Sequence, residues 1–134
     1  MSADALEIAN LKARYCLAAD AACGDPERAL AMFDNLFTDD FTGDYGFKVM
    51  RGKDEMAAFM IQAIGGGSEW MVHALGSPLI VVDGDASTGD WTISVNSRRR
   101  DGAGLMQVTC RYSDSFRRTA NGWRIATIRF ERYE

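Results

Sequence analysis

The sequence predicts an α+β fold in which three N-terminal helices pack into the hollow of a strongly curved antiparallel sheet. Two observations support this prediction. Residues 4–63 hold three segments in which apolar side chains recur at helical spacing, whereas residues 72–133 hold four long runs separated by turn signals. These runs exceed the usual strand length of about five or six residues, so we expect the strands to curl. The chain has 134 residues, and we expect one domain over residues 1–134.

The helical half is predicted in three pieces. Residues 4–22 contain almost no helix breaker, and their apolar side chains form two stripes on a helical wheel, so we expect the first helix to be buried around most of its circumference. The second helix begins with Asp25 as N-cap and Pro26 in the first turn. Residues 37–47 are predicted to hold a turn at 38–40 and a short strand. A third helix follows residues 51–54 and ends at the glycines of 65–67.

The strand half is predicted as an antiparallel meander. Its strands are expected at residues 72–82, 88–98, 105–118 and 123–133. Glycine-containing turns separate them, and Asn121-Gly122 is the typical signal of a tight hairpin.

Composition and charge narrow the classes of partner. The formal net charge is −4, so the chain has no general attraction for phosphate backbones or anionic membranes. We therefore expect neither nucleic acid nor membrane as a partner. The N-terminus is acidic where a signal peptide is basic, and three cysteines leave one unpaired in any disulfide scheme. The cytoplasm is the expected compartment.

His73 is the only histidine, and so the one candidate for imidazole acid–base chemistry near neutral pH. It stands at the start of a predicted strand among apolar neighbours such as Trp70. Asp20 is a carboxylate on an apolar stripe of the first helix, which is costly unless the group is paired. It could hold His73 in one tautomer. Both residues also have a structural interpretation: His73 as a core histidine held by one hydrogen bond, and Asp20 as a cap of a backbone group.

Tyrosines provide further candidates. Tyr45 ends the short predicted strand, where its phenol could donate a hydrogen bond to a carbonyl or leaving-group oxygen, or merely line a wall. Tyr15 lies about 140° from Asp20 on the helical wheel, with roughly 100° per residue, but could line the same cavity. Tyr112 and Asp114 share one face of a predicted strand, and alternation alone does not say whether that face is inside.

No motif indicates a metal or an organic cofactor. Residues 83–94 lack the glycine and glutamate that a calcium loop needs, and a single histidine without paired cysteines does not predict zinc. The glycines at 65–67 lack the lysine of a phosphate-binding loop. We expect no metal and no cofactor.

Taken together, the chain resembles the SnoaL-like branch of the NTF2-like superfamily across nearly its whole length. The resemblance rests on the order and spacing of Arg14-Tyr15, Asp20, residues 36–41, Tyr45, His73, residues 82–85, residues 112–118 and residues 122–125. It implies a cone with a deep apolar pocket, built from three helices and a strongly curved mixed or antiparallel sheet, and a homodimer formed through that sheet.

Dehydratase and isomerase members of this superfamily imply a function for the matching residues. His73 would be the base, Asp20 would support it, and Tyr45 and Tyr15 would stabilise negative charge on a substrate oxygen. Ala19 and Val95 stand where such members carry a tyrosine and an aspartate.

The resulting prediction is a cofactor-independent lyase, such as a dehydratase, or an isomerase acting on a hydrophobic carbonyl compound such as a steroid, polyketide or aromatic catabolite. We expect the substrate to contact Trp70, Trp91, Phe59, Tyr112 and Asp114. Two alternatives remain: a non-catalytic protein that binds a hydrophobic small ligand, and a structural subunit of a larger oxygenase complex.

Overall fold

The computed structural model describes residues 2–133, and it has the α+β cone that the sequence predicts. One six-stranded sheet, in the order β2-β1-β6-β5-β4-β3, accompanies the helices. Neighbouring strands run antiparallel except β1 and β6, which are parallel. The elements in chain order are α1 (Ala3–Ala21), α2 (Pro26–Phe33), β1 (Phe37–Asp44), β2 (Val49–Arg51), α3 (Gly52–Met60), a π-helical turn η1 (Ile61–Gly65), β3 (Ser68–Asp83), β4 (Ala86–Arg99), β5 (Leu105–Thr119) and β6 (Gly122–Tyr133).

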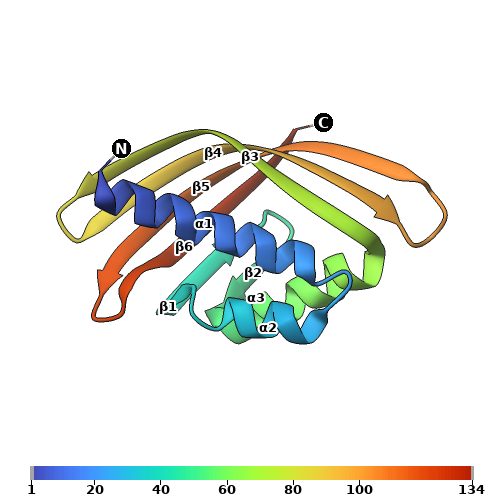
Figure 1. The fold of residues 1–134 in the computed structure, drawn as a ribbon, viewed down its shortest axis with the longest axis horizontal. Coiled ribbons are helices and arrows are strands. Elements are labelled where there is room, and N and C mark those ends of the chain that lie inside the picture. The colour runs from blue at the N-terminus through green and yellow to red at the C-terminus, as the bar shows by residue number, and fades with distance from the viewer. Residues whose placement is uncertain (1, 134) are drawn as a thin grey trace.

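The four long strands arch over α1, which lies along the concave side of the sheet, while α2 and α3 lie at one end of the arch (Figure 1). The core fills the space between α1 and the inward-facing side chains of the sheet. Strands of 12 to 16 residues cannot stay flat, because the right-handed twist accumulates along them. This curvature creates the hollow that receives the helices.

The predicted helix starts are confirmed. The Ser2 hydroxyl accepts a hydrogen bond from the Ala5 N–H at 3.1 Å and caps α1. The Asp25 carboxylate accepts one from the Arg28 N–H at the same distance, and Pro26 begins α2. In both cases the side chain satisfies an N–H that has no partner within the helix.

Three local predictions were wrong. Residues 38–40, expected as a turn, belong to β1 and lie at the register shift between Phe37 and Thr42, the two positions that flank this irregular stretch and pair with β6. The short strand β2 was not predicted; its only neighbour is β1. The third helix does end at the glycines, but its last turn, η1, is π-helical rather than α-helical.

The prediction that α1 is buried around most of its circumference is confirmed. On the second apolar stripe Cys16 is buried and Ala9 and Ala13 are half-buried, while Leu6 is 52% exposed. The charged side chain of Lys12 is also fully buried. From Asp4 onward, the exposed side chains of the helix share one narrow face: Leu6, Glu7, Asn10, Arg14 and Leu17.

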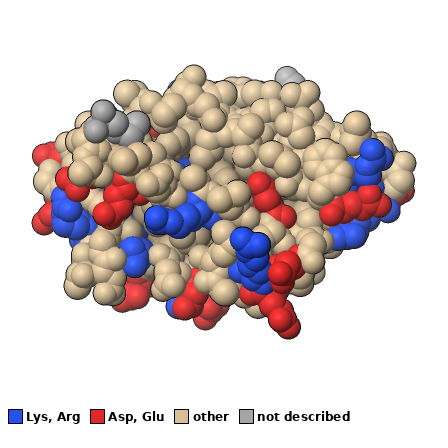
Figure 2. All heavy atoms as spheres, in the orientation of Figure 1, with Lys and Arg blue, Asp and Glu red and all other residues tan. Residues whose placement is uncertain are grey.

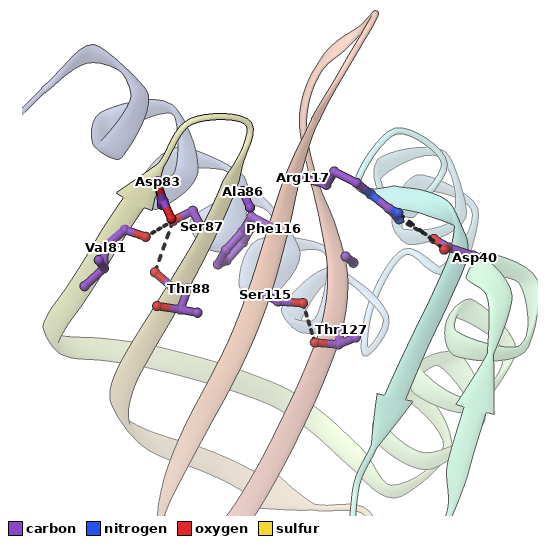
Figure 3. Close-up of a pocket in the computed structure, with 11 residues that line it drawn as sticks. Asp40, Val81, Asp83, Ala86, Ser87, Thr88, Ser115, Phe116, Arg117 and Thr127 are labelled. Atoms are coloured by element: carbon purple, nitrogen blue, oxygen red, sulfur yellow. Dashed lines mark hydrogen bonds and ion pairs between the residues drawn. The ribbon is translucent and has the colours of Figure 1, made fainter.

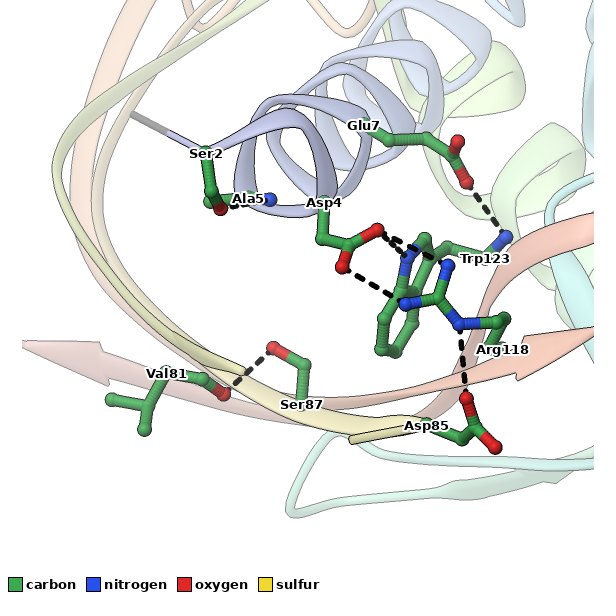
Figure 4. Close-up of polar contacts among 9 residues, drawn as sticks. All are labelled: Ser2, Asp4, Ala5, Glu7, Val81, Asp85, Ser87, Arg118 and Trp123. Carbon is green, nitrogen blue, oxygen red and sulfur yellow. Dashed lines mark hydrogen bonds and ion pairs between the residues drawn. The ribbon is translucent and has the colours of Figure 1, made fainter. Parts of the chain in front are cut away.

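Both ends of α1 are fastened to the sheet. At the N-terminal end, Arg118 donates to both carboxylate oxygens of Asp4 and also pairs with Asp85 at 3.0 Å (Figure 4). Trp123 Nε1 donates to Asp4 at 3.1 Å, and the Trp123 N–H donates to Glu7 at 2.8 Å. These contacts join the first turn of α1 to the β3–β4 and β5–β6 hairpins.

At the other end, Arg100 donates to the Cys23 carbonyl at 2.7 Å and to the Gly65 carbonyl at 3.0 Å. Gly65 packs so tightly on the end of α1 that an added Cβ would lie 2.4 Å from the Ala22 carbonyl oxygen. The position of Asp20, one turn before this end, is therefore tied to η1 and to the β4–β5 hairpin.

Among residues 2–133, no helix combines the length and the apolar character needed to cross a membrane.

Candidate functional site

A pocket of about 380 Å³ lies between the concave face of the sheet, α3 and η1. Such a volume is in the range of small-molecule sites. Its wall is mainly apolar, and the polar side chains on it are His73, Tyr45, Tyr112 and Arg132, with the thiol of Cys110 beside them. The apolar part of the wall includes Phe59, Met71, Val95, Met106, Val108 and Phe130.

Asp20 and His73 meet at this pocket. Oδ1 of Asp20 lies 2.5 Å from Nδ1 of His73, and the His73 backbone N–H donates to both carboxylate oxygens at 3.2 and 3.3 Å. The His73 side chain is only 5% exposed and that of Asp20 is 19% exposed. Because Nδ1–H donates to the carboxylate, the lone pair lies on Nε2, the position from which imidazole acts as a base.

Three tyrosine hydroxyls gather at the inner end of the pocket. The Tyr15 hydroxyl is in close hydrogen-bond contact with that of Tyr45 and lies 3.4 Å from that of Tyr112. Burial raises the pKa of each phenol well above its ordinary value, so all three remain neutral donors at physiological pH. Tyr45 and Tyr112 line the pocket, whereas Tyr15 lies behind them on α1 and contacts both.

Tyr45 is held by the turn after β1. Its N–H donates to the Lys48 carbonyl at 2.9 Å, and its ring stacks on Phe130 at 5.2 Å between centroids. Gly46 follows with a φ of 84°, a conformation that favours glycine, and its N–H donates to Asp44. This tight turn aims the phenol back into the hollow.

A buried ion pair lies behind the tyrosines. Nζ of Lys12 is 2.9 Å from Oδ2 of Asp114, and both side chains are fully buried. Trp91 Nε1 donates to the same carboxylate oxygen at 2.8 Å. Burial raises the pKa of Asp114, while the neighbouring ammonium opposes that shift. The ammonium also lies 3.5 Å from the ring centroid of Tyr112.

Of the five residues expected to contact substrate, Phe59 and Tyr112 line the pocket and three do not. Trp70 points to the outer face of the sheet, because it alternates with Met71 and His73 along β3. Trp91 and Asp114 face inward but are buried beneath α1, each paired within the core. The expectation that these three line the pocket is therefore corrected.

Two charged residues were missed from the sequence, Lys12 behind the pocket and Arg132 on its wall, besides several apolar wall residues. Lys12 lies four residues from both Ile8 and Cys16, which are apolar, and residues at that spacing share a face of a helix. The sequence could therefore have placed Lys12 on the buried face. Arg132 shares a face of β6 with Phe130, and alternation from that aromatic residue could have indicated it.

A second, shallow hollow of about 520 Å³ lies on the opposite side of the sheet (Figure 3). Val81, Thr88, Ser115 and Thr127 stand opposite one another on adjacent strands, and the Ser115 and Thr127 hydroxyls are 2.5 Å apart. We place the candidate site in the smaller pocket, because a paired histidine faces an apolar wall there.

No group of three or more His, Cys, Asp or Glu side chains that could hold a metal ion occurs within residues 2–133. The polar side chains of the pocket wall offer proton transfer by His73 and hydrogen bonding by the tyrosines. Independence from a cofactor stays a prediction.

Comparison with known proteins places this geometry in a family. The model of the SnoaL-like domain family matches residues 1–129. No curated protein is similar enough in sequence to count as a match.

Solved structures share the fold. An NTF2-like superfamily protein from Salmonella enterica serovar Typhimurium is 23% identical, with a TM-score of 0.84 over 96% of this chain and 90% of that one. The Kfla4162 protein from Kribbella flavida is 23% identical, with a TM-score of 0.79 over 98% and 91%. Hexachlorocyclohexane dehydrochlorinase LinA-type3 from Novosphingobium barchaimii is 12% identical, with a TM-score of 0.82 over 95% and 84%.

The family match covers nearly the whole chain, and solved structures share its fold. The chain therefore belongs to the SnoaL-like domain family, and it shares the fold of the NTF2-like superfamily protein.

Proposed function

We propose that this protein is a cofactor-independent lyase or isomerase that transfers a proton on a hydrophobic carbonyl compound. The observation that carries the proposal is the 2.5 Å contact between Asp20 and His73 at an apolar pocket that also holds tyrosine hydroxyls. A buried carboxylate that fixes a histidine tautomer and stabilises its protonated form is a recurring feature of general bases.

The first step would be removal of a proton from the carbon beside the substrate carbonyl. Nε2 of His73 accepts the proton, the C–H electron pair forms a carbon–carbon double bond, and the carbonyl electrons move to oxygen to give an enolate. Asp20, as a positioning residue, stabilises the imidazolium. In a dehydration the enolate then expels a hydroxide that takes the proton from His73 and leaves as water. In an isomerisation the proton returns to another carbon.

The tyrosines would stabilise the enolate oxygen. Tyr45 and Tyr112 line the pocket, and their neutral hydroxyls gather with that of Tyr15 at its inner end. Donors held in place before the reaction need no reorganisation when the charge develops, which makes such contacts effective. The apolar wall excludes water and strengthens them.

The test is proton transfer on a panel of probes. The panel contains β-hydroxyketones for dehydration and cyclic enones in D₂O for exchange and isomerisation. It also contains hexachlorocyclohexane, because a protein of the same fold is named a hexachlorocyclohexane dehydrochlorinase. We expect the wild type to convert at least one class and His73→Ala to lose about 10²–10⁴-fold in rate. Equal rates for both proteins would contradict the proposal. Saturable binding without conversion of any class would favour the ligand-binding alternative.

We propose further that two copies of the chain associate through the outer face of the sheet, within the cytoplasm. Four exposed side chains of β3 are large and apolar: Trp70, Val72, Leu79 and Val81. Charged residues of this strand are exposed only near its two ends, at Glu69 and Asp83. Charged side chains on the face shown in Figure 2 mix both signs and gather away from the upper margin, where the strands arch. An apolar patch with few charges is the composition typical of a subunit interface.

A further inference from the structure

Lys12 is a buried cation that the proton-transfer steps do not use. Its side chain is fully buried, and although Nζ lies 2.9 Å from Asp114 Oδ2, no hydrogen bond of suitable geometry satisfies it within the described chain. The ammonium also lies over the faces of two tyrosine rings. Nζ lies 3.5 Å from the centroid of Tyr112 and 4.2 Å from that of Tyr15. A desolvated cation this close to a ring interacts strongly with its π electrons.

Tyr112 lies between the Lys12–Asp114 ion pair and the pocket. Along the inner face of β5, Cys110 and Tyr112 line the pocket, and Asp114 is the next inward residue beyond them. Asp114 is turned toward Trp91, which holds its Oδ2 at 2.8 Å. Tyr112 therefore stands between the pocket and the carboxylate, while the ammonium lies against the ring of that same tyrosine.

Burying such a pair is expensive in free energy. Removing both charges from water costs several kcal/mol per ion, and apolar side chains of similar volume are often as stabilising or more so. The pair thus calls for a role beyond stability. A cation on a phenol ring withdraws electron density from it, which makes the hydroxyl a stronger hydrogen-bond donor.

We propose that Lys12 is a positioning residue whose ammonium strengthens the hydroxyl donors of Tyr112 and Tyr15, so that the pocket prefers a ligand with an anionic oxygen, an enolate or a phenolate. The inference rests on the proposed function, because that enolate is the species the reaction would form. Tyr45 shares in the effect through its hydrogen bond to Tyr15.

The charged and titratable groups around the pair are few. The thiol of Cys16, on the same helix, interacts electrostatically with both Lys12 and Asp114. Burial raises the pKa of this thiol to about 12, so it stays neutral. Asp90 acts on Asp114 from the neighbouring strand. On the pocket side, the other groups that could attract an anion are His73, when protonated, and Arg132.

The test measures which form of 4-nitrophenol binds, because its phenol and phenolate absorb at different wavelengths. All proteins carry His73→Ala, so that no imidazolium contributes. We expect this parent to lower the apparent pKa of the bound probe. The second protein adds Lys12→Met and Asp114→Asn to this parent, so that no buried charge is left unpaired. We expect the pKa of its bound probe to be about one unit higher than in the parent, which is a tenfold loss of phenolate preference.

Two controls make the result specific. Binding of 4-nitroanisole, the methyl ether that cannot ionise, should be unchanged in the double substitution. A parallel loss of its binding would mean that the pair only supports the pocket wall, and would overturn the inference. Arg132→Gln in the same parent should keep most of the phenolate preference. If Arg132→Gln abolishes the phenolate preference while the double substitution of Lys12 and Asp114 leaves it intact, Arg132 is the source of the preference and the inference is wrong.

The two proposals fail separately. Absence of phenolate preference in the parent protein would overturn the role of Lys12 and leave His73 untouched. Absence of proton transfer by the wild type on every probe, with phenolate preference intact, would reject the enzyme and leave an anion-selective binding pocket.

Discussion

The Asp20 carboxylate holds His73 at two points, the backbone N–H and the imidazole Nδ1, although the two residues are 53 positions apart in the chain. One contact fixes the strand β3 against α1, and the other fixes the orientation of the ring. The same carboxylate thus serves the packing of the cone and the geometry of the candidate base.

Substitution of Asp20 by Asn should lower the rate of proton transfer by about 10²–10⁴-fold, similar to His73→Ala. Asn retains an acceptor for the His73 N–H but cannot stabilise an imidazolium. The rate on whichever probe the wild type converts is the measurement. Asp39→Asn, on an exposed aspartate that has no side-chain partner among the described residues, is the control and should leave the rate unchanged. Full activity of Asp20→Asn would exclude the positioning role.

Lys12→Met alone should reduce the free energy of unfolding by about 3–5 kcal/mol, because it leaves the buried Asp114 carboxylate without its partner. Lys12→Met combined with Asp114→Asn removes both charges and should recover most of that loss. Urea unfolding followed by tryptophan fluorescence measures both. A single variant as stable as the double one would mean that the pair is not coupled.

The contact of Asp4 with Arg118 predicts a pH dependence. The Arg118 guanidinium, followed by the Trp123 indole N–H, lowers the pKa of Asp4 below 3.8, so the carboxylate is more acidic in the folded chain than in the unfolded one. Its contribution to stability is complete above about pH 4 and is lost as the pH falls through the folded pKa.

Asp4→Asn should therefore be less stable than the wild type at neutral pH, and the difference should shrink below pH 3.8. Thermal unfolding at a series of pH values measures it. Arg117 similarly lowers the pKa of Asp40, and this effect is the same in both proteins and cancels. A difference that stays constant down to pH 2 would contradict the assignment.

Gly65 and Gly66 form a matched pair for testing how α1 meets η1. An added Cβ at Gly65 would lie 2.4 Å from the Ala22 carbonyl oxygen, whereas nothing lies within 4 Å at Gly66. Gly65→Ala should lose about 1–3 kcal/mol of stability, because backbone must shift to relieve the overlap. Gly66→Ala should be neutral or slightly stabilising. Equal melting temperatures for the two variants would refute the close approach.

The proposed dimer predicts concentration-dependent mass. Val72→Lys with Leu79→Lys places two charges on the outer face of β3 and should shift the protein toward monomer in analytical ultracentrifugation. Leu17→Lys, on an equally exposed apolar residue of α1, is the control and should remain dimeric. A wild type that is monomeric at all concentrations would exclude the association.

Much of the fold was readable from sequence, because it rests on local patterns. The run of residues 4–22 without a helix breaker predicted α1, Asp25 and Pro26 predicted where α2 begins, and turn signals between long runs predicted the four long strands. Where pairing with a distant segment decides the structure, the prediction was wrong: residues 38–40 lie within β1, in the irregular stretch between the two points where this strand pairs with β6.

In the candidate site, too, the sequence predicted which residues are unusual but not which of them are in contact. A lone histidine and a carboxylate on an apolar stripe, His73 and Asp20, stand out in the sequence because each is costly to bury without a partner. The way in which the curved sheet closes over α1 decides whether these two residues meet and which side of β3 faces the pocket. It also decides that the Lys12 ammonium lies against the ring of Tyr112. Spacing along one element determines the direction in which a side chain points, but only packing between elements determines what it touches.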